Sequence, residues 1–253
     1  MRENHRVLTL ALLGPTASGK SSLAIETALH LGAQGRPAEV VNADSMLVYR
    51  GMDIGTAKPG PAERRGVAHH LIDIMEVTET ATVAQFQQLA RATIADCHRR
   101  RVIPILTGGS ALYLRAILDD FTFPGTDPQL RAQLEQELAH RGPYPLHQRL
   151  AQLAPDTARQ ILPGNGRRIV RALEVVELTG SYQPRLPAYH YVLDSVVAFG
   201  LRIDRAEMDR RIDSRVDAMW QAGLVDEVRR LVRVGLRQGR TASRGLGYAQ
   251  VLD

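Results

Sequence analysis

The sequence predicts an α/β protein, with a parallel β-sheet flanked by helices and an all-helical subdomain inserted into it. Two observations carry this prediction. Short apolar runs, typical of strands buried on both faces, alternate with stretches of helical periodicity over residues 1–120. Between residues 121 and 190 helix follows helix, with proline and glycine at the breaks. A last apolar run at 196–203 returns to the sheet, so we expect a core of residues 1–120 plus 191–253 and a helical insertion of residues 121–190.

The composition is that of a globular protein, with 44% hydrophobic and 23% charged residues. No signal peptide precedes the first strand, and no apolar stretch approaches the roughly 18 residues that a membrane span requires. The single cysteine, Cys97, cannot form an internal disulfide, and its spacing from neighbouring apolar residues predicts a buried helical position. A reducing cytoplasm, with no membrane, fits this pattern.

The most informative motif follows the first apolar run. Residues 7–13 lead into GPTASGKS at 14–21, which has the form GxxxxGK[ST] of the phosphate-binding P-loop, and a helical pattern comes after it. The glycines allow several backbone N–H groups to point at one anion, Lys20 adds a positive charge, and the Ser21 hydroxyl suits a magnesium ion. The sequence therefore predicts a P-loop NTPase-like sheet that holds phosphates on Gly14, Pro15, Thr16, Ala17, Ser18, Gly19, Lys20 and Ser21.

Other candidate residues follow the later strands. The apolar run 38–43 ends at Asp44, and ligands of open parallel sheets collect beyond the carboxyl ends of strands. Asp44 either faces the P-loop crevice or caps a turn, and its position alone leaves both open. The run 102–106 ends in Thr-Gly-Gly and Ser110 before a helix over 111–118, so those glycines serve either a second anion-binding turn or close packing.

Histidines and arginines raise two further questions. His69 and His70 sit in a strand expected at 69–74, but no third ligand lies at a spacing typical of a metal site, which favours a structural or substrate-contacting role. The net charge of +5 is unevenly distributed along the chain. Six arginines near the end of the sequence have no acidic residue between them, which suits either a polyanion such as nucleic acid or a solvated surface. They are Arg229, Arg230, Arg233, Arg237, Arg240 and Arg244.

Several P-loop classes are disfavoured. ATPases and GTPases need a second acidic residue after an apolar strand for magnesium, whereas the run 102–106 ends in Thr-Gly-Gly and the guanine-reading NKxD is absent. Ile72-Asp73 is a weak substitute.

Taken together, the segments resemble the tRNA dimethylallyltransferases, also called isopentenyl-tRNA transferases. The matching segments occur in that family's order across nearly the whole chain: GPTASGKS (14–21), NADSMLVYRGMDIGTAKP (42–59), HHLID (69–73), TGGSALYLRAIL (107–118), RRIVRALEV (167–175), the helix 205–215 with GLVDEV (223–228), and RGLGY (244–248). The sequence also departs from the family pattern. Gly164-Asn165-Gly166 stands where the family more often has Asn-Asp, Ala249 stands where a basic residue is usual, and the chain ends at Asp253 where the family normally continues with a further basic helical stretch.

The resemblance implies a reaction and roles. The family transfers the dimethylallyl group from dimethylallyl diphosphate to the exocyclic amine (N6) of the adenosine 3′ to the anticodon of tRNA. By motif position Asp44 matches the general base, and Lys20, Arg215 and Ser110 complete the catalytic set. Mg²⁺ near Ser21 would help to stabilise the leaving diphosphate.

The resemblance also implies that the helical insertion grips the anticodon stem-loop of tRNA. We expect a monomer, although no feature of the sequence reveals the oligomeric state. The positions that match tRNA contacts are Asp44, Ser45, Met46, Leu47, Ser110, Arg131, Arg167, Arg168, Ile169, Val170, Arg171 and Arg244. Three alternatives stay open: an isopentenyltransferase acting on free AMP, ADP or ATP, a small-molecule kinase, and a non-catalytic RNA-binding protein.

Overall fold

The computed structural model describes residues 7–120, 123–182 and 189–253. The chain divides into two compact units, residues 1–120 with 190–253 and residues 121–189.

The first unit is built on a five-stranded sheet in which every strand pairs in parallel, as the sequence predicts. The strand order is β3-β2-β4-β1-β5. Because all strands are parallel, their carboxyl ends share one edge. The strands are β1 (Thr9–Leu13), β2 (Ala38–Asn42), β3 (His69–His70), β4 (Ile103–Gly108) and β5 (Val196–Gly200).

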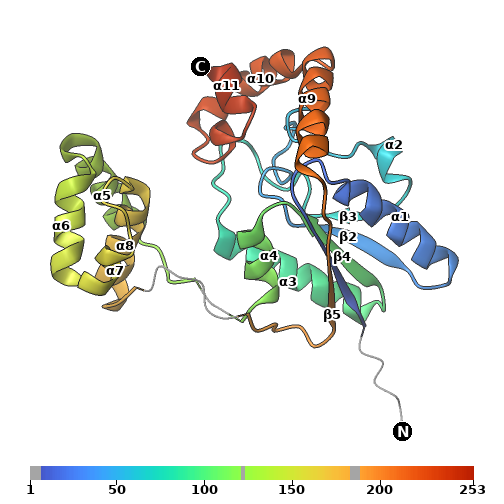
Figure 1. Cartoon of the computed structure of the whole chain (residues 1–253), viewed down its shortest axis with the longest axis horizontal. Helices are drawn as coiled ribbons and strands as arrows, with labels where there is room; N and C mark the ends of the chain where they lie inside the picture. Colours follow the sequence, from blue (N-terminus) through green and yellow to red (C-terminus); the bar gives the residue numbers. More distant parts are fainter. Residues whose placement is uncertain (1–6, 121–122, 183–188) are drawn as a thin grey trace, which may run out of the picture. The chain divides into compact units, whose positions relative to one another are not determined.

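Helices cover the two faces of this sheet (Figure 1). Helix α1 (Lys20–Ala33) packs on the face that carries Leu10 and Leu12. Helices α3 (Val83–Arg99) and α4 (Ala111–Leu118) pack on the other face, where the intervening Ala11 points. The remaining helices are α2 (Pro61–Arg64), α9 (Arg205–Gln221), α10 (Leu224–Arg233) and α11 (Tyr248–Leu252), with short 3-10 turns η1 (Leu236–Gln238) and η2 (Ala242–Arg244).

Two strands differ from the sequence prediction. Strand β3 stops at His70 because Leu71 and Asp73 adopt left-handed backbone conformations, with φ of 61° and 55°, which end an extended chain. Strand β5 joins the sheet beside β1 but is not buried. It is one of the two edge strands of the sheet, and Phe199 is 52% exposed.

The second unit is all helical. It contains α5 (Pro128–Arg141), α6 (Pro143–Leu153), α7 (Pro155–Arg159) and α8 (Gly166–Thr179). Three of these begin with proline, which lacks the N–H that a first helical turn leaves unpaired, and the Asp127 side chain caps α5. Their apolar faces form a separate core that includes Leu146, Leu150 and Leu173. None of the helices in the described ranges is long and apolar enough to cross a membrane.

Candidate active site

A pocket of about 620 Å³ opens in the first unit, beyond the carboxyl ends of β1, β2 and β4. Its lining brings together segments that lie far apart in the sequence: Thr16, Ala17, Ser18, Gly19, Lys20, Ser21, Ser22, Ile25, Glu26, Asp44, Leu47, Thr56, Ala57, Pro59, Glu63, Arg65, Thr107, Gly108, Gly109, Arg211 and Arg215. The P-loop, Asp44 and Arg215, which the sequence analysis singled out separately, therefore share one site.

The P-loop follows β1 and ends at the first turn of α1. Gly19 has a φ of 84°, a left-handed conformation that favours glycine. A Cβ on Gly14 would lie 2.9 Å from the Ser18 hydroxyl oxygen and 3.1 Å from the Leu201 Cβ, so this position also needs glycine. The first turn of α1 contains no acidic residue. The pocket therefore receives the positive end of the α1 dipole, which favours an anion.

Lys20 is folded back onto the loop, where its Nζ donates a hydrogen bond to the Pro15 carbonyl at 2.6 Å. Burial lowers the pKa of the ammonium, Asp44 acts in the opposite direction, and Arg215 lowers it further. The Arg215 guanidinium shows the same pattern, with its pKa lowered by burial and raised by Asp44. These three groups are therefore electrostatic neighbours around one pocket.

Asp44 both turns the chain and lines the pocket, so the two roles left open by its position are compatible. Its Oδ1 accepts the Met46 N–H at 2.9 Å, and its own N–H donates to the Asn42 Oδ1 at 2.8 Å. The Asn42 amide also donates to the Asp44 and Leu71 carbonyls, which ties the end of β2 to the segment after β3. The carboxylate is thus held at the end of β2 by bonds to the backbone.

Two arginines reach the pocket from α9. Arg215 donates to the Thr56 carbonyl at 3.1 Å. Arg211, one turn earlier, donates to the Glu207 carboxylate at 2.7 Å and to the Ala17 carbonyl of the P-loop at 3.5 Å. The sequence analysis did not select Arg211. Its i, i+4 spacing from Arg215 puts both on one side of the helix and was the signal that could have identified it.

The end of β4 answers the question about the glycines. A Cβ on Gly108 would lie 2.3 Å from the Ala43 carbonyl oxygen, so this glycine serves the close packing of β4 against β2. Thr107, which sequence reasoning did not select, lines the pocket with a buried hydroxyl that has no partner among the described residues. Ser110 precedes α4 and lies next to Gly109, although it is not itself part of the lining.

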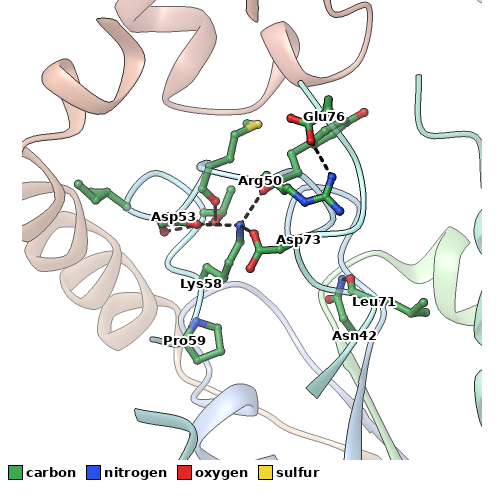
Figure 2. A network of polar contacts seen from close by, with 12 residues as sticks. Asn42, Arg50, Asp53, Lys58, Pro59, Leu71, Asp73 and Glu76 are labelled. Carbon is green, nitrogen blue, oxygen red and sulfur yellow. Dashed lines mark hydrogen bonds and ion pairs between the residues drawn. The ribbon is translucent and has the colours of Figure 1, made fainter. Parts of the chain in front are cut away.

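The loop from residue 46 to residue 59 is held in place by the second lysine of the chain (Figure 2). Lys58 is buried, and its Nζ contacts the Asp73 Oδ1 at 2.5 Å, the Asp53 Oδ1 at 2.8 Å and the Tyr49 carbonyl at 2.6 Å. A buried ammonium is stable only when it is paired and hydrogen-bonded in this way. Lys58 therefore fixes the pocket wall that Thr56, Ala57 and Pro59 form.

The histidine pair is structural. His70 contacts Glu39 at 2.6 Å, and Cys97 completes a trio of possible metal ligands within 4.8 Å of one another. Arg100, however, donates to both Glu39 oxygens at 2.7 Å. These bonds lead the causes that hold the pKa of Glu39 at about 2, while burial raises the pKa of Cys97 to about 11. Because Arg100 already engages both oxygens of Glu39, these contacts form an ion-paired cluster that joins β2, β3 and the end of α3. Cys97 is buried as predicted.

The residues of the second unit that the family resemblance assigned to tRNA fall into two groups. Arg167 and Arg168 are exposed at the start of α8. The next two side chains, Ile169 and Val170, are 0% and 1% exposed because they face the helical core, so they offer no side-chain surface to an RNA. A tRNA contact at these two positions would therefore involve their backbone, and the assignment stays a prediction.

Arg131 and Arg171 both bond to Glu174, which is fully buried. Burial raises the pKa of this carboxyl, but hydrogen bonds from Thr126, Arg171 and Arg131 outweigh that effect and leave it lowered. Arg171 also donates to the carbonyls of residues 124 and 125. Both arginines therefore stabilise the helical unit by forming ion pairs with the same buried carboxylate.

The remaining predicted contacts lie in the first unit. Leu47 lines the pocket, Ser45 is hydrogen-bonded to Tyr113, and Met46 packs against the core. Arg244 is exposed in η2.

A parallel sheet whose P-loop shares a pocket with a carboxylate and a partly buried arginine defines an enzyme of the P-loop NTPase-like fold that acts on a phosphorylated substrate. Comparison with known proteins specifies the family. The family model described as IPP transferase matches residues 47–253. A tRNA dimethylallyltransferase of Thermobifida fusca is 59% identical over 96% of this chain and 76% of its own length.

Solved structures agree. The tRNA isopentenylpyrophosphate transferase of Bacillus halodurans matches with a TM-score of 0.65 and 38% identity, over 98% of this chain and 77% of that one. A eukaryotic dimethylallyltransferase acting on tRNA matches with a TM-score of 0.77 and 25% identity, over 97% of this chain and 62% of that one. The chain belongs to the tRNA dimethylallyltransferase family.

Proposed function

We propose that this protein transfers the dimethylallyl group of dimethylallyl diphosphate to N6 of the adenosine 3′ to the anticodon of tRNA and releases diphosphate. The observation that carries the mechanism is the meeting of the P-loop, Lys20, Arg215 and Asp44 in one pocket. Membership of the family supports the choice of substrates.

The pocket suits each part of this reaction. The N6–C1 bond forms while the C1–O bond to diphosphate breaks, so negative charge grows on the leaving group. The P-loop amides, Lys20 and Arg215 stabilise that charge electrostatically. The adenine amine loses a proton as it bonds to carbon, and Asp44 accepts it as the general base. Ser110, beside the β4 glycines, is proposed to help place the adenosine.

Mg²⁺ fits the same pocket. This ion is held by a few oxygen ligands together with water and substrate phosphates. The Ser21 hydroxyl on α1 and the unpartnered Thr107 hydroxyl at the end of β4 both line the pocket and offer such oxygens, directly or through water. Bound Mg²⁺ would supply charge neutralisation to the diphosphate.

The tRNA is proposed to bind through exposed basic side chains. Arg167, Arg168 and Arg244 are exposed and suit phosphate contacts, while the 44–47 segment lies at the pocket, where the target base must arrive out of its stack. Because one chain supplies every group named, we propose a monomeric enzyme.

The acceptor decides between this function and its alternatives. The protein is incubated with Mg²⁺ and labelled dimethylallyl diphosphate, and either tRNA, AMP or ATP is offered. We expect label on tRNA only, at the adenosine 3′ to the anticodon. Label on AMP or ATP would identify a free-nucleotide isopentenyltransferase, and consumption of ATP without transfer of label would identify a kinase.

A further inference from the structure

The motifs GLVDEV and RGLGY contribute one residue each to a polar cluster that the proposed mechanism does not use. Glu227 of α10 is 2% exposed, and its carboxylate accepts hydrogen bonds from the backbone N–H groups of Asp53, Ile54 and Gly55. The Tyr248 hydroxyl of α11 donates a fourth bond at 2.5 Å. A buried carboxylate with four donors is fully satisfied, and such an arrangement specifies one geometry for the groups around it.

The cluster closes tightly around the 53–55 turn. A Cβ on Gly55 would lie 2.6 Å from the Tyr248 ring, so only glycine lets the turn approach this closely. Burial and the bond to Glu227 both raise the pKa of the Tyr248 hydroxyl, which keeps it protonated and donating. On its other side the turn is held by Lys58 through Asp53. The segment is therefore fixed at both ends.

The residue that follows this turn contacts the catalytic arginine. The Thr56 carbonyl accepts the hydrogen bond from Arg215, and the Thr56 hydroxyl donates to the Met52 carbonyl at 2.6 Å. A chain of contacts thus runs from Glu227 through residues 53–55 to Thr56 and the Arg215 guanidinium. Without this contact, the long Arg215 side chain would sample several rotamers, and binding an anion would cost the conformational entropy of fixing one of them.

We propose that Glu227 is a positioning residue, which with Tyr248 holds the 53–56 turn so that the Thr56 carbonyl orients Arg215 toward the leaving diphosphate. This inference rests on the proposed role of Arg215. It predicts that Glu227 acts on diphosphate binding only through Arg215, whereas a residue that merely stabilises the fold would act equally with or without that arginine.

The test is a double-mutant cycle on the affinity for inorganic diphosphate in the presence of Mg²⁺, measured by calorimetry. Glu227→Gln keeps the shape of the side chain, but its amide NH₂ group replaces one carboxylate oxygen and cannot accept hydrogen bonds from the two donors that face it. We expect it to weaken binding by about fivefold in the wild-type background and to have no effect on top of Arg215→Ala, as for coupled contacts in one network. Asp226→Asn is the matched control, because Asp226 lies one position earlier and is exposed in a pair with Arg229. It should leave the affinity for diphosphate unchanged in both backgrounds.

Tyr248→Phe provides a second, milder variant, because it removes one donor and keeps the ring against Gly55. It should give the same pattern with a weakening of about twofold, and it decides the question if Glu227→Gln does not fold. Equal weakening in both backgrounds, or none in either, would overturn the inference while leaving the role of Arg215 intact. If Arg215→Ala itself bound diphosphate normally, the role of Arg215, and with it this inference, would fail.

Discussion

At the scale of residues, burial separates two arginines that stand on the same side of one helix. Arg211 and Arg215 stand one turn apart on α9, and both line the pocket. Arg211 is half exposed and paired with Glu207, whereas Arg215 is partly buried, its pKa is lowered by desolvation, and a backbone carbonyl orients it. Charge interactions are stronger where water is excluded, so Arg215 should contribute more.

We expect Arg215→Ala to lower kcat/KM for dimethylallyl diphosphate by about 10²-fold, as loss of one oriented donor to a developing anion does. Arg211→Ala should lower it by less than about tenfold, in line with an exposed ion pair. Arg205→Ala, exposed at the start of the same helix, serves as the control. Steady-state kinetics with saturating tRNA test this order, and a larger loss for Arg211→Ala would contradict it.

At the scale of elements, buried and partly buried carboxylates fasten helices to strands and to each other. Glu39 on β2 joins His70 on β3 to Arg100 after α3. Glu174 on α8 joins Arg131 on α5 to its own helix neighbour Arg171. The sequence does not predict these pairings. Three of them join residues that lie more than 30 positions apart. The fourth, Arg171 with Glu174, looks like an ordinary surface pair until the burial of Glu174 is known.

The Glu39 cluster predicts a pH dependence of stability. Folding lowers the pKa of Glu39 from 4.5 to about 2. The contribution of this carboxylate to the free energy of unfolding is therefore fully present above pH 4.5 and is lost as the pH falls toward 2. At pH 7 we expect Glu39→Gln to lower the free energy of unfolding by about 2 kcal/mol. Denaturant unfolding at several pH values checks this. A difference between variant and wild type that did not shrink toward acid pH would contradict it.

The helical unit predicts different outcomes for two neighbouring arginines. Arg168 is exposed, so Arg168→Ala should leave thermal stability unchanged and reduce the salt dependence of tRNA binding by about one unit of slope. Arg171→Ala removes a partner of the buried Glu174 and should also destabilise the unit, by about 3 kcal/mol. Filter binding at several salt concentrations and thermal unfolding measure both. An unchanged salt slope for Arg168→Ala would argue against tRNA contact there.

At the scale of the whole molecule, the sequence predicts what depends on local pattern. The parallel sheet, the P-loop at residues 14–21 and the helix over 111–118 follow from apolar runs and glycine spacing. The short length of β3 could not be predicted, because it depends on the left-handed backbone at Leu71 and Asp73. The exposure of β5 could not be predicted either, because it depends on the order of the strands in the sheet. Thr107 and Glu227 escaped notice because only tertiary contacts give these common residue types a role at the site. Arg211 could have been selected from its i, i+4 spacing to Arg215.

The central claim is that one pocket holds the diphosphate while Asp44 takes the proton from the attacking amine. Asp44→Asn keeps the shape of the side chain and the acceptor for the Met46 N–H but removes the base. Single-turnover transfer from dimethylallyl diphosphate to tRNA is measured together with the affinity for each substrate. The account predicts a rate lower by about 10²–10⁴-fold with both affinities within about threefold of wild type. Transfer at the wild-type rate would contradict it.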